Sequence, residues 1–386
     1  MAQIHGICTS KFQKVRDLFQ QFLDSGEEVG ASITVNVDGE DVINLWGGFV
    51  NAERTQPWNE DTIVPVASST KMIPALAVLM LADSGAISVY DKVSKHWPEF
   101  AANGKEDIEI RHCLSHTSGV AGWDEKLTMD DICDVASSAA KLAGQAPWWT
   151  PGTASAYHGW NFGHLLSEIV YRVTGMYLKE FIAKNITGPL GADFQIGLKE
   201  EDEARLSEFI PTPPSAPPRD LGPLFIKVLG NPSMAPAMGR TKAWRNGEIG
   251  ASNGYGNARA LNTMLSHVTL AGLDSVKADA RLLSASTVNL IFEEQSYGKD
   301  LAVGKTIRFG IGYALRGDGD TWVDDWLPAG RVAYWGGSGG SLGIMDVDRR
   351  VTITYAMNQK SNDMIGNTAS RAYIKAIYEA LGVEME

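Results

Sequence analysis

Residues 62–85 have the sequence TIVPVASSTKMIPALAVLMLADSG. In it an apolar segment, TIVPVA, meets an apolar helix that we expect to run from Lys71 to Asp83 and to end at Gly85. At the junction Ser68 and Lys71 form the pattern S-x-x-K, and an offset of three puts both side chains on one helix face. A desolvated lysine can take the proton of a serine hydroxyl, which is otherwise a weak nucleophile. The stretch therefore predicts a nucleophilic serine at the start of a buried helix.

The S-x-x-K pattern also occurs at Ser138–Lys141 and at Ser296–Lys299, so the pattern alone is weak support for a nucleophile. Both of those serines lie among small or polar residues, and we expect them at the surface. Of the three serines, Ser68 is the one that lies between two apolar segments. This context favours Ser68 as the nucleophile.

Strand-like segments occur near both ends of the chain. GASITVNV and DVINLWGGF flank Asp38-Gly39, which predicts a hairpin, and an amphipathic helix over residues 10–24 precedes it. Three further segments, RVAYWGG, SLGIMDV and VTITYAMN, are followed by a predicted helix over residues 369–381. The sequence therefore predicts an α/β (α+β) fold, in which one antiparallel sheet flanked by helices is built from both termini.

The middle of the chain has a different pattern. Residues 90–244 show mostly helical periodicity broken by Gly and Pro, which predicts a mostly helical domain inserted into an α/β domain of residues 1–89 and 245–386. Within the insertion, residues 211–223 have the sequence PTPPSAPPRDLGP, which is too rich in proline for regular structure. We expect a long loop there.

The composition limits the partners and the location of the protein. Its 34 basic and 46 acidic residues give a formal charge of −12, and without a basic stripe we expect no nucleic-acid partner. Three cysteines in 386 residues cannot form a disulfide framework, and the first residues lack the pattern of a signal peptide. The longest apolar stretch, residues 73–82, is half of what a membrane span needs. We therefore expect a soluble, reduced, cytoplasmic protein with no membrane span, while the sequence predicts no oligomeric state.

A second serine motif, GGSGG at residues 336–340, matches the G-x-S-x-G turn of α/β-hydrolases. That fold needs a catalytic histidine after the serine in the chain, whereas the last of the seven histidines is His267. The motif therefore does not make Ser338 the nucleophile of such a fold. We expect its glycines to let a strand approach a ligand closely.

Two further patterns bear on metals and cofactors. His112 and His116 have the i, i+4 spacing of zinc ligands, but no third ligand is apparent, and we expect structural histidines. The segment NGYGN at residues 253–257 lacks the third glycine and the preceding strand of a dinucleotide loop. We expect no metal and no cofactor.

Four segments, in order, resemble the serine β-lactamase-like superfamily, in the branch with class C β-lactamases, DD-peptidases and family VIII carboxylesterases. The motif at residues 68–71 resembles the family's nucleophile motif, and IEIRHCLSHTSGV at residues 108–120 resembles its LLTHTSGL segment. PGTASAYHGWNFGHLLSEIVYRVTG at residues 151–175 is similar to its PGT…Y-x-N stretch, with Tyr157 as the motif tyrosine. Trp335 stands where the family carries the lysine of K-T-G. The resemblance covers about residues 12–380 and implies a β-lactamase/transpeptidase-like fold.

The resemblance also implies a mechanism. Ser68 would attack an ester carbonyl, and Lys71 and Tyr157 would share the proton, with the tyrosine phenolate favoured beside a cationic lysine. The backbone N–H groups of Ser68 and Ser338 would hold the tetrahedral oxygen. Water would then release the acyl group.

Two departures from the family pattern narrow the expected function. Trp335 replaces the lysine that engages a substrate carboxylate, and Gly159 replaces the asparagine of Y-x-N. W-G-G resembles family VIII esterases, so we expect a serine carboxylesterase that acts on small esters with neutral acyl groups. The expected substrate-binding residues are Trp335, Gly336, Gly337, His158 and Gly159. An apolar wall is expected to include the Pro-rich loop, Met234, Met238 and Trp244.

Other functions remain compatible with these residues. The acyl group can pass to an alcohol, which would make the protein an acyltransferase, or weak β-lactamase or DD-peptidase activity can persist. An inactive scaffold that binds a ligand is the non-enzymatic alternative. Intact Ser68, Lys71 and Tyr157 count against that scaffold.

Overall fold

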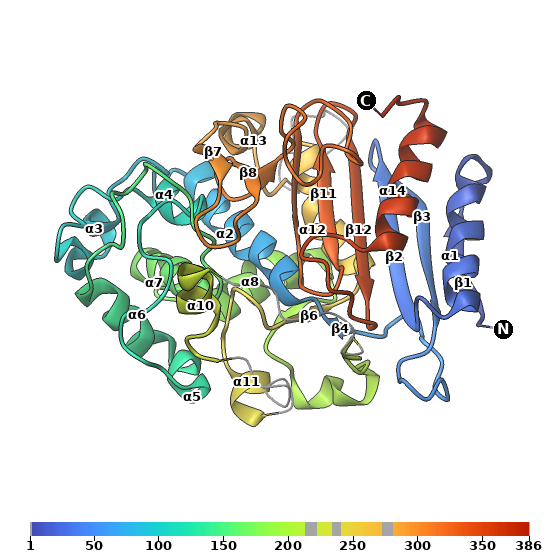
Figure 1. Cartoon of the computed structure of the whole chain (residues 1–386), viewed down its shortest axis with the longest axis horizontal. Helices are drawn as coiled ribbons and strands as arrows, with labels where there is room; N and C mark the ends of the chain where they lie inside the picture. Colours follow the sequence, from blue (N-terminus) through green and yellow to red (C-terminus); the bar gives the residue numbers. More distant parts are fainter. Residues whose placement is uncertain (1, 213–221, 234–240, 272–280, 386) are drawn as a thin grey trace.

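An antiparallel sheet of nine strands is the largest element of the computed structural model, which describes residues 2–212, 222–233, 241–271 and 281–385 (Figure 1). The strands are β1 (Ile4–Cys8), β2 (Gly30–Val37), β3 (Glu40–Gly48), β4 (Val64–Pro65), β5 (Gln195–Ile196), β6 (Gly254–Gly256), β7 (Ser296–Lys299), β8 (Thr306–Phe309), β9 (Ala314–Leu315), β10 (Val332–Gly336), β11 (Leu342–Asp346) and β12 (Val351–Met357). The large sheet has the order β1-β3-β2-β12-β11-β10-β9-β8-β7, and β4, β6 and β5 form a second, small sheet.

Helices surround the sheet and fill the other half of the molecule (Figure 1). They are α1 (Gln13–Ser25), α2 (Met72–Asp83), α3 (Val93–His96), α4 (Ile110–Leu114), α5 (Met129–Cys133), α6 (Val135–Gly144), α7 (Phe162–Thr174), α8 (Leu178–Ile182), α9 (Gly188–Leu190), α10 (Pro223–Leu229), α11 (Lys242–Asn246), α12 (Ala258–Thr269), α13 (Ala285–Ile291) and α14 (Thr368–Leu381). Within the described ranges, none of these helices combines the length and the apolar character needed to cross a membrane.

The two ends of the chain meet in the middle of the sheet. Strand β2 pairs with β12 in antiparallel register, with Thr34 opposite Thr354. The predicted hairpin joins β2 to β3, and its turn residues Asp38 and Gly39 have positive φ angles of 54° and 92°. The prediction of one antiparallel sheet assembled from both termini is confirmed.

The alternating side chains of β12 explain how helices cover both faces of the sheet. Thr354 points to one face, where its hydroxyl donates to the carbonyl of Ala258 at the start of α12. Tyr355 points to the other face, where its ring lies 6.0 Å from that of Tyr373 on α14. Helix α1 packs beside α14, with the Phe22 and Tyr373 rings edge to face at 5.6 Å. The period-two pattern of the strand therefore fixes which helix lies on which face.

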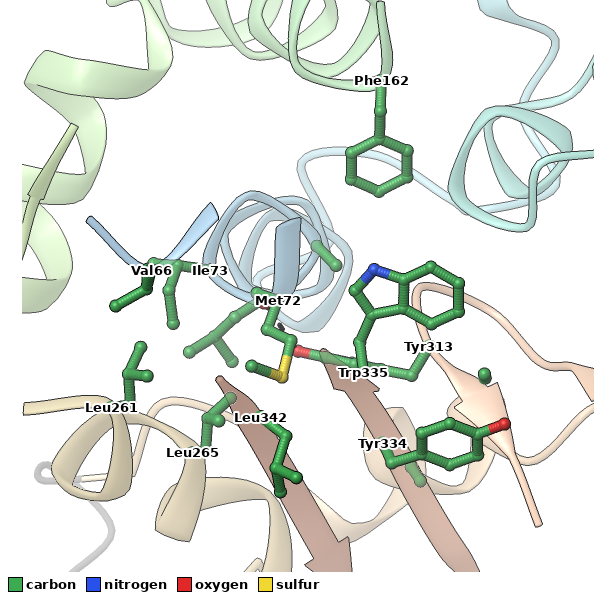
Figure 2. Packing of buried hydrophobic residues seen from close by; sticks show 14 of the residues in the cluster. Val66, Met72, Ile73, Phe162, Leu261, Leu265, Tyr313, Tyr334, Trp335 and Leu342 are labelled. Atoms are coloured by element: carbon green, nitrogen blue, oxygen red, sulfur yellow. Dashed lines mark hydrogen bonds between the residues drawn. The ribbon is translucent and has the colours of Figure 1, made fainter. Parts of the chain in front are cut away.

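The segment that carries Ser68 begins with a tight 3₁₀ turn, η2 (Ala67–Lys71), and continues directly into α2. Ala67 has a φ of +47°, a left-handed conformation that is strained for a residue with a side chain. Pro74 is the third residue of α2 and lies beyond the first turn of the continuous helical segment, where its ring removes one backbone hydrogen bond. Figure 2 shows Met72, the first residue of α2, between α12 and the strand that carries Trp335. The predicted helix is confirmed, and it is buried nearly all round.

Helix α7 touches the chain next to α2 through two glycines. A Cβ atom on Gly163 would lie 2.7 Å from the backbone nitrogen of Ala251 and equally close to Gly250. Such distances are shorter than van der Waals contact, so the absence of a side chain lets the helix approach. The approach also fixes the position of Ala251, whose carbonyl has a role in the site described below.

We expect Gly163→Ala to destabilise the protein by about 1–3 kcal/mol, because the methyl group must displace backbone atoms. Gly144→Ala is the matched control in another helix, since a Cβ atom there meets nothing within 4 Å. That control is expected to leave stability unchanged or raise it by up to about 1 kcal/mol. Urea unfolding followed by circular dichroism measures both. Equal stabilities for the two variants would show that the close contact is unimportant.

Candidate active site

The three residues that the sequence singled out for catalysis lie together. Ser68 and Lys71 come from η2, and Tyr157 comes from the irregular segment between α6 and α7. The Tyr157 hydroxyl donates to Ser68 Oγ over 2.7 Å, and Lys71 Nζ lies 3.4 Å from the same oxygen. Ser68 is partly exposed, whereas the other two are buried. A partly exposed hydroxyl between two buried proton-transfer groups is an arrangement suited to nucleophilic attack.

Lys71 is a buried amine held by backbone oxygens. Its Nζ donates to the carbonyls of Gly159, at 2.9 Å, and Ala251, at 2.8 Å. Burial lowers the pKa of Lys71 well below its ordinary value of 10.5. Nζ also contacts Ser68 Oγ, as a third possible acceptor. Once Lys71 is deprotonated it keeps two hydrogens, and the two carbonyls accept both. The nitrogen lone pair is then left for the hydroxyl hydrogen of Ser68, so Lys71 can act as the base.

Tyr157 is held as a phenol in this structure. Its side chain is only 4% exposed, and burial raises its pKa above the ordinary value of 10.0. The family resemblance implied a phenolate favoured by a cationic lysine, whereas burial here shifts the pKa of Tyr157 upward and that of Lys71 downward, which favours the neutral form of both groups. As a phenol, Tyr157 donates to Ser68 Oγ and can later protonate a leaving group.

Aromatic rings surround the phenol. The ring of Trp335 lies 5.4 Å from that of Tyr157, and the ring of His116 lies 5.2 Å away. Burial lowers the pKa of His116 well below its ordinary value, so it is a neutral ring here, and its Nδ1 accepts from the backbone N–H of His158. The sequence placed His116 among structural histidines and missed its place beside the tyrosine. Its position inside the family-like segment 108–120 is the signal that points to the site.

Trp335 has one unsatisfied group. Its side chain is 5% exposed, and its indole N–H is buried without a hydrogen bond of good geometry. The N–H is nevertheless close enough to the Tyr157 hydroxyl to lower the pKa of that group slightly, against the larger effect of burial. Trp335 therefore lies against the reacting groups and belongs to the apolar wall of the site.

The two residues after Tyr157 have different positions. His158 is buried behind the loop, where its Nε2 pairs with the Ser118 hydroxyl and its Nδ1 with the Ala156 carbonyl, both at 2.7 Å. Gly159 lies beside the amine of Lys71, and a Cβ atom on it would come within 2.3 Å of Leu229 Cδ2. Leu229, from α10, thus occupies the space where the family's asparagine side chain would begin.

The glycine-rich turn after β10 is joined to the nucleophile segment. A Cβ atom on Gly337 would lie 2.4 Å from the Val66 carbonyl oxygen, and the Ser341 hydroxyl donates to that same oxygen. The Ser341 hydroxyl also pairs with that of Ser69 at 2.9 Å. Gly337 therefore lets the turn after β10 pack closely against the segment that carries Ser68. Ser338 follows directly, with an exposed side chain.

The remaining sequence motifs have structural positions. Ser138 is fully buried, with its hydroxyl donating to the Asp131 carbonyl, so the prediction of a surface position is wrong for this residue. Asn257 caps α12, and Trp244 packs edge to face on Trp160 at 5.9 Å. Most of the Pro-rich loop 211–223, together with Met234 and Met238, falls outside the described residues.

Comparison with known proteins agrees with this geometry. The chain matches the family described as Beta-lactamase over residues 15–376. Esterase/beta-lactamase LipL of Mycobacterium tuberculosis is 26% identical over 379 residues, which cover 94% of this chain and 85% of that protein. The crystal structure of a family VIII carboxylesterase is 33% identical, with a TM-score of 0.90 and coverage of 98% of this chain and 100% of that one.

A second solved structure is nearly as similar to this chain. A penicillin-binding protein homologue from Caulobacter crescentus is 29% identical, with a TM-score of 0.88 over 98% of this chain and 100% of that chain. The predicted fold class and the predicted superfamily are both confirmed. The family match spans nearly the whole chain and includes the segments that carry Ser68, Lys71, Tyr157 and Trp335. The chain therefore belongs to the beta-lactamase family.

Proposed function

We propose that the protein is a serine hydrolase of the carboxylesterase type, which forms an acyl intermediate on Ser68. The observation that carries the proposal is the contact of Ser68 Oγ with both the Tyr157 hydroxyl, at 2.7 Å, and Lys71 Nζ, at 3.4 Å. The likeness to a family VIII carboxylesterase and to LipL supports it. We further propose a cytoplasmic location, which is supported by three cysteines that are all free thiols.

The reaction begins with proton transfer to Lys71. As Ser68 Oγ bonds to the ester carbonyl carbon, its proton moves to the neutral amine, and the carbonyl electrons move onto the oxygen. We assign the backbone N–H groups of Ser68 and Ser338 to that oxygen, where each donor typically contributes about 10²–10³ in rate. The carbonyls of Gly159 and Ala251 stabilise the ammonium that forms on Lys71.

The leaving alcohol requires a proton, which Tyr157 supplies. When the tetrahedral intermediate collapses, the phenol protonates the departing alkoxide, and the Lys71 ammonium returns a proton to the phenolate. Water then attacks the acyl carbon, with Lys71 again taking a proton, and Ser68 regains its hydrogen as the acid leaves. An alcohol in place of water would take the acyl group by the same route.

The lining of the site favours uncharged substrates. Trp335 supplies an apolar plane, and Leu229 fills the space beside Gly159 where an amide would otherwise reach toward the substrate. Lys71, the cation-forming group of the site, is already occupied by two carbonyls. A carboxylate placed here would lose its water without gaining a cationic partner, which costs several kcal/mol. We therefore assign neutral acyl groups to this site.

β-Lactam hydrolysis is the second candidate, because LipL is described as both an esterase and a β-lactamase. It would use the same acyl-Ser68 chemistry. The replacement of the family lysine by Trp335 counts against it, since penicillins carry a carboxylate.

Ser68→Ala is expected to abolish ester hydrolysis, because the variant lacks the attacking oxygen. Lys71→Ala and Tyr157→Phe should each lower kcat by several orders of magnitude, and their combination should cost little more than the worse of the two, because they act in one proton relay. Initial rates with ethyl butyrate, whose alkoxide leaving group needs the proton from Tyr157, measure all four variants in a pH-stat. Ser338→Ala is the control, since only its backbone N–H is assigned a role. Loss of activity in that control, with retention in Ser68→Ala, would refute the assignment.

The pH dependence follows from the two buried groups. Lys71 must be unprotonated to accept a proton, so kcat/KM is expected to fall as the pH drops through its lowered pKa and to be full above it. Tyr157 must be protonated, and its raised pKa places any alkaline loss above pH 10. A pH-stat assay with a neutral alkyl ester between pH 5 and 10 should show a single acid limb. A decline that sets in between pH 7 and 9 would contradict a phenol at position 157.

Uncharged short- and medium-chain esters are expected to be cleaved at least about 10²-fold more efficiently, by kcat/KM, than penicillins or D-Ala-D-Ala peptides. Trp335→Lys should shift that ratio toward the carboxylate substrates by restoring a cation. Parallel kinetics with p-nitrophenyl esters, nitrocefin and benzylpenicillin give the ratio. If the unmodified protein hydrolyses benzylpenicillin as fast as its best ester, the second candidate replaces the first.

A further inference from the structure

A buried carboxylate lies directly behind the proposed proton donor. Asp300 follows the last residue of β7, and its side chain is fully buried. Within the described part of the chain, no lysine, arginine or histidine forms an ion pair with it. Burying an unpaired carboxylate is costly. The hydrogen bonds of Asp300 indicate why the carboxylate is buried here.

Those contacts lead to the tyrosine. Asp300 Oδ1 accepts hydrogen bonds from three backbone N–H groups: that of Tyr157 at 3.2 Å, Ala302 at 3.0 Å and Val303 at 2.9 Å. Its second oxygen, Oδ2, is buried without a hydrogen bond of good geometry, and the Ser155 hydroxyl is near enough to lower the pKa of the carboxyl against the larger effect of burial. Oδ1 thus joins the turn that contains Asp300 to the residue that touches Ser68 Oγ.

Backbone hydrogen bonds close the turn, and the turn also binds the tyrosine segment at a second point. The N–H of Asp300 donates to the Lys305 carbonyl at 2.9 Å, and that of Gly304 donates to the Asp300 carbonyl at 2.8 Å. Two residues before Tyr157, the Ser155 carbonyl accepts from the Leu301 N–H at 2.8 Å. The backbone on both sides of Ala156 is therefore hydrogen-bonded to the turn at residues 300–305.

Asp300 also affects the protonation of Tyr157, in addition to holding its backbone. The titratable groups that face Tyr157 are Lys71 on η2, His116 after α4, and the neighbouring His158, none of which is an anion. Burial raises the pKa of Tyr157, and the carboxyl of Asp300 adds to this shift, which keeps the proton on the phenol oxygen. Hydrogen bonds to a charged acceptor are also stronger than those to a neutral one.

We propose that Asp300 is a positioning residue, which fixes the backbone of Tyr157 so that its hydroxyl can protonate the leaving alcohol. This inference rests on the proposed esterase function. A carboxylate that merely closed the turn at 300–305 would affect stability alone. A positioning residue must affect the one step in which the phenol donates its proton.

The test compares two butyrate esters that differ only in their need for that proton. Ethyl butyrate releases a strongly basic alkoxide, whereas p-nitrophenyl butyrate releases a stable phenolate that leaves without an acid. Asp300→Ala is expected to lower kcat for the ethyl ester by about 10- to 100-fold, with little change in KM and a much smaller effect on the p-nitrophenyl ester. Asp300→Asn, which keeps a neutral acceptor, should fall between Asp300→Ala and the unmodified protein.

A double-mutant cycle adds a second criterion. Tyr157→Phe should show the same leaving-group-dependent loss, and adding Asp300→Ala to it should cost the ethyl ester nothing further, because the acid is already gone. Asp346→Asn is the matched control: Asp346 is an equally buried carboxylate at the far end of β11. This control should change both esters by the same factor. Additive effects at 157 and 300, or leaving-group dependence in the control, would overturn the proposal.

Labelling with a fluorophosphonate makes the comparison independent of folding losses. Ser68 Oγ attacks phosphorus and fluoride leaves, so the reaction counts intact nucleophiles without using the tyrosine as an acid, and rates are expressed per labelled site. If Asp300→Ala does not fold, Asp300→Asn with the same two esters decides. If the unmodified protein hydrolyses neither ester, the proposed function fails. If it hydrolyses both and the Asp300 variants lose both equally, only the positioning role fails.

Discussion

The structure of the site depends on keeping one amine buried without a counter-ion. Lys71 lies in the interior with two backbone carbonyls as partners, and burial lowers its pKa well below the ordinary value of 10.5, which favours the neutral amine. Each carbonyl must be held by packing, because carbonyl dipoles replace water only if they cannot turn away. The Ala251 carbonyl is fixed where Gly163 meets Gly250, and the Gly159 carbonyl is fixed beneath Leu229. The packing of α7 and α10 is thus part of the chemistry.

A neutral base and a neutral acid suit an apolar site. In the proposed mechanism Tyr157 and Lys71 both enter the reaction uncharged, so charge separation develops only as Ser68 attacks and is cancelled when the proton is returned. Few polar groups then need to be kept in the site, and rings such as Trp335 and His116 can line it. The low dielectric of this lining strengthens the hydrogen bonds to the developing charges. In the same lining a substrate carboxylate would lose its hydration without gaining a cationic partner, which disfavours its binding.

Local sequence patterns were sufficient for the antiparallel sheet built from both termini and for the buried helix after Ser68. Each of these depends on periodicity or on neighbours within a few residues. Tyr157 and Trp335 were placed only through the resemblance to a family. Leu229, Asp300 and His116 were missed because their contacts join segments about 40–140 residues apart, which no local pattern records. The charge state of Tyr157 was predicted wrongly because it depends on burial, and burial is a property of the assembled fold.

The join between the two ends of the chain has a consequence for biosynthesis. The Val66 carbonyl, two residues before Ser68, accepts a hydrogen bond from the hydroxyl of Ser341, and β12, which follows in the chain, pairs with β2. A ribosome releases the serine, the lysine and the tyrosine long before it releases these strands. The nascent chain therefore carries its nucleophile as an ordinary, unreactive hydroxyl for most of its synthesis. The complete active site can therefore form only near the end of synthesis, when the C-terminal strands have been made and can pair with the N-terminal ones.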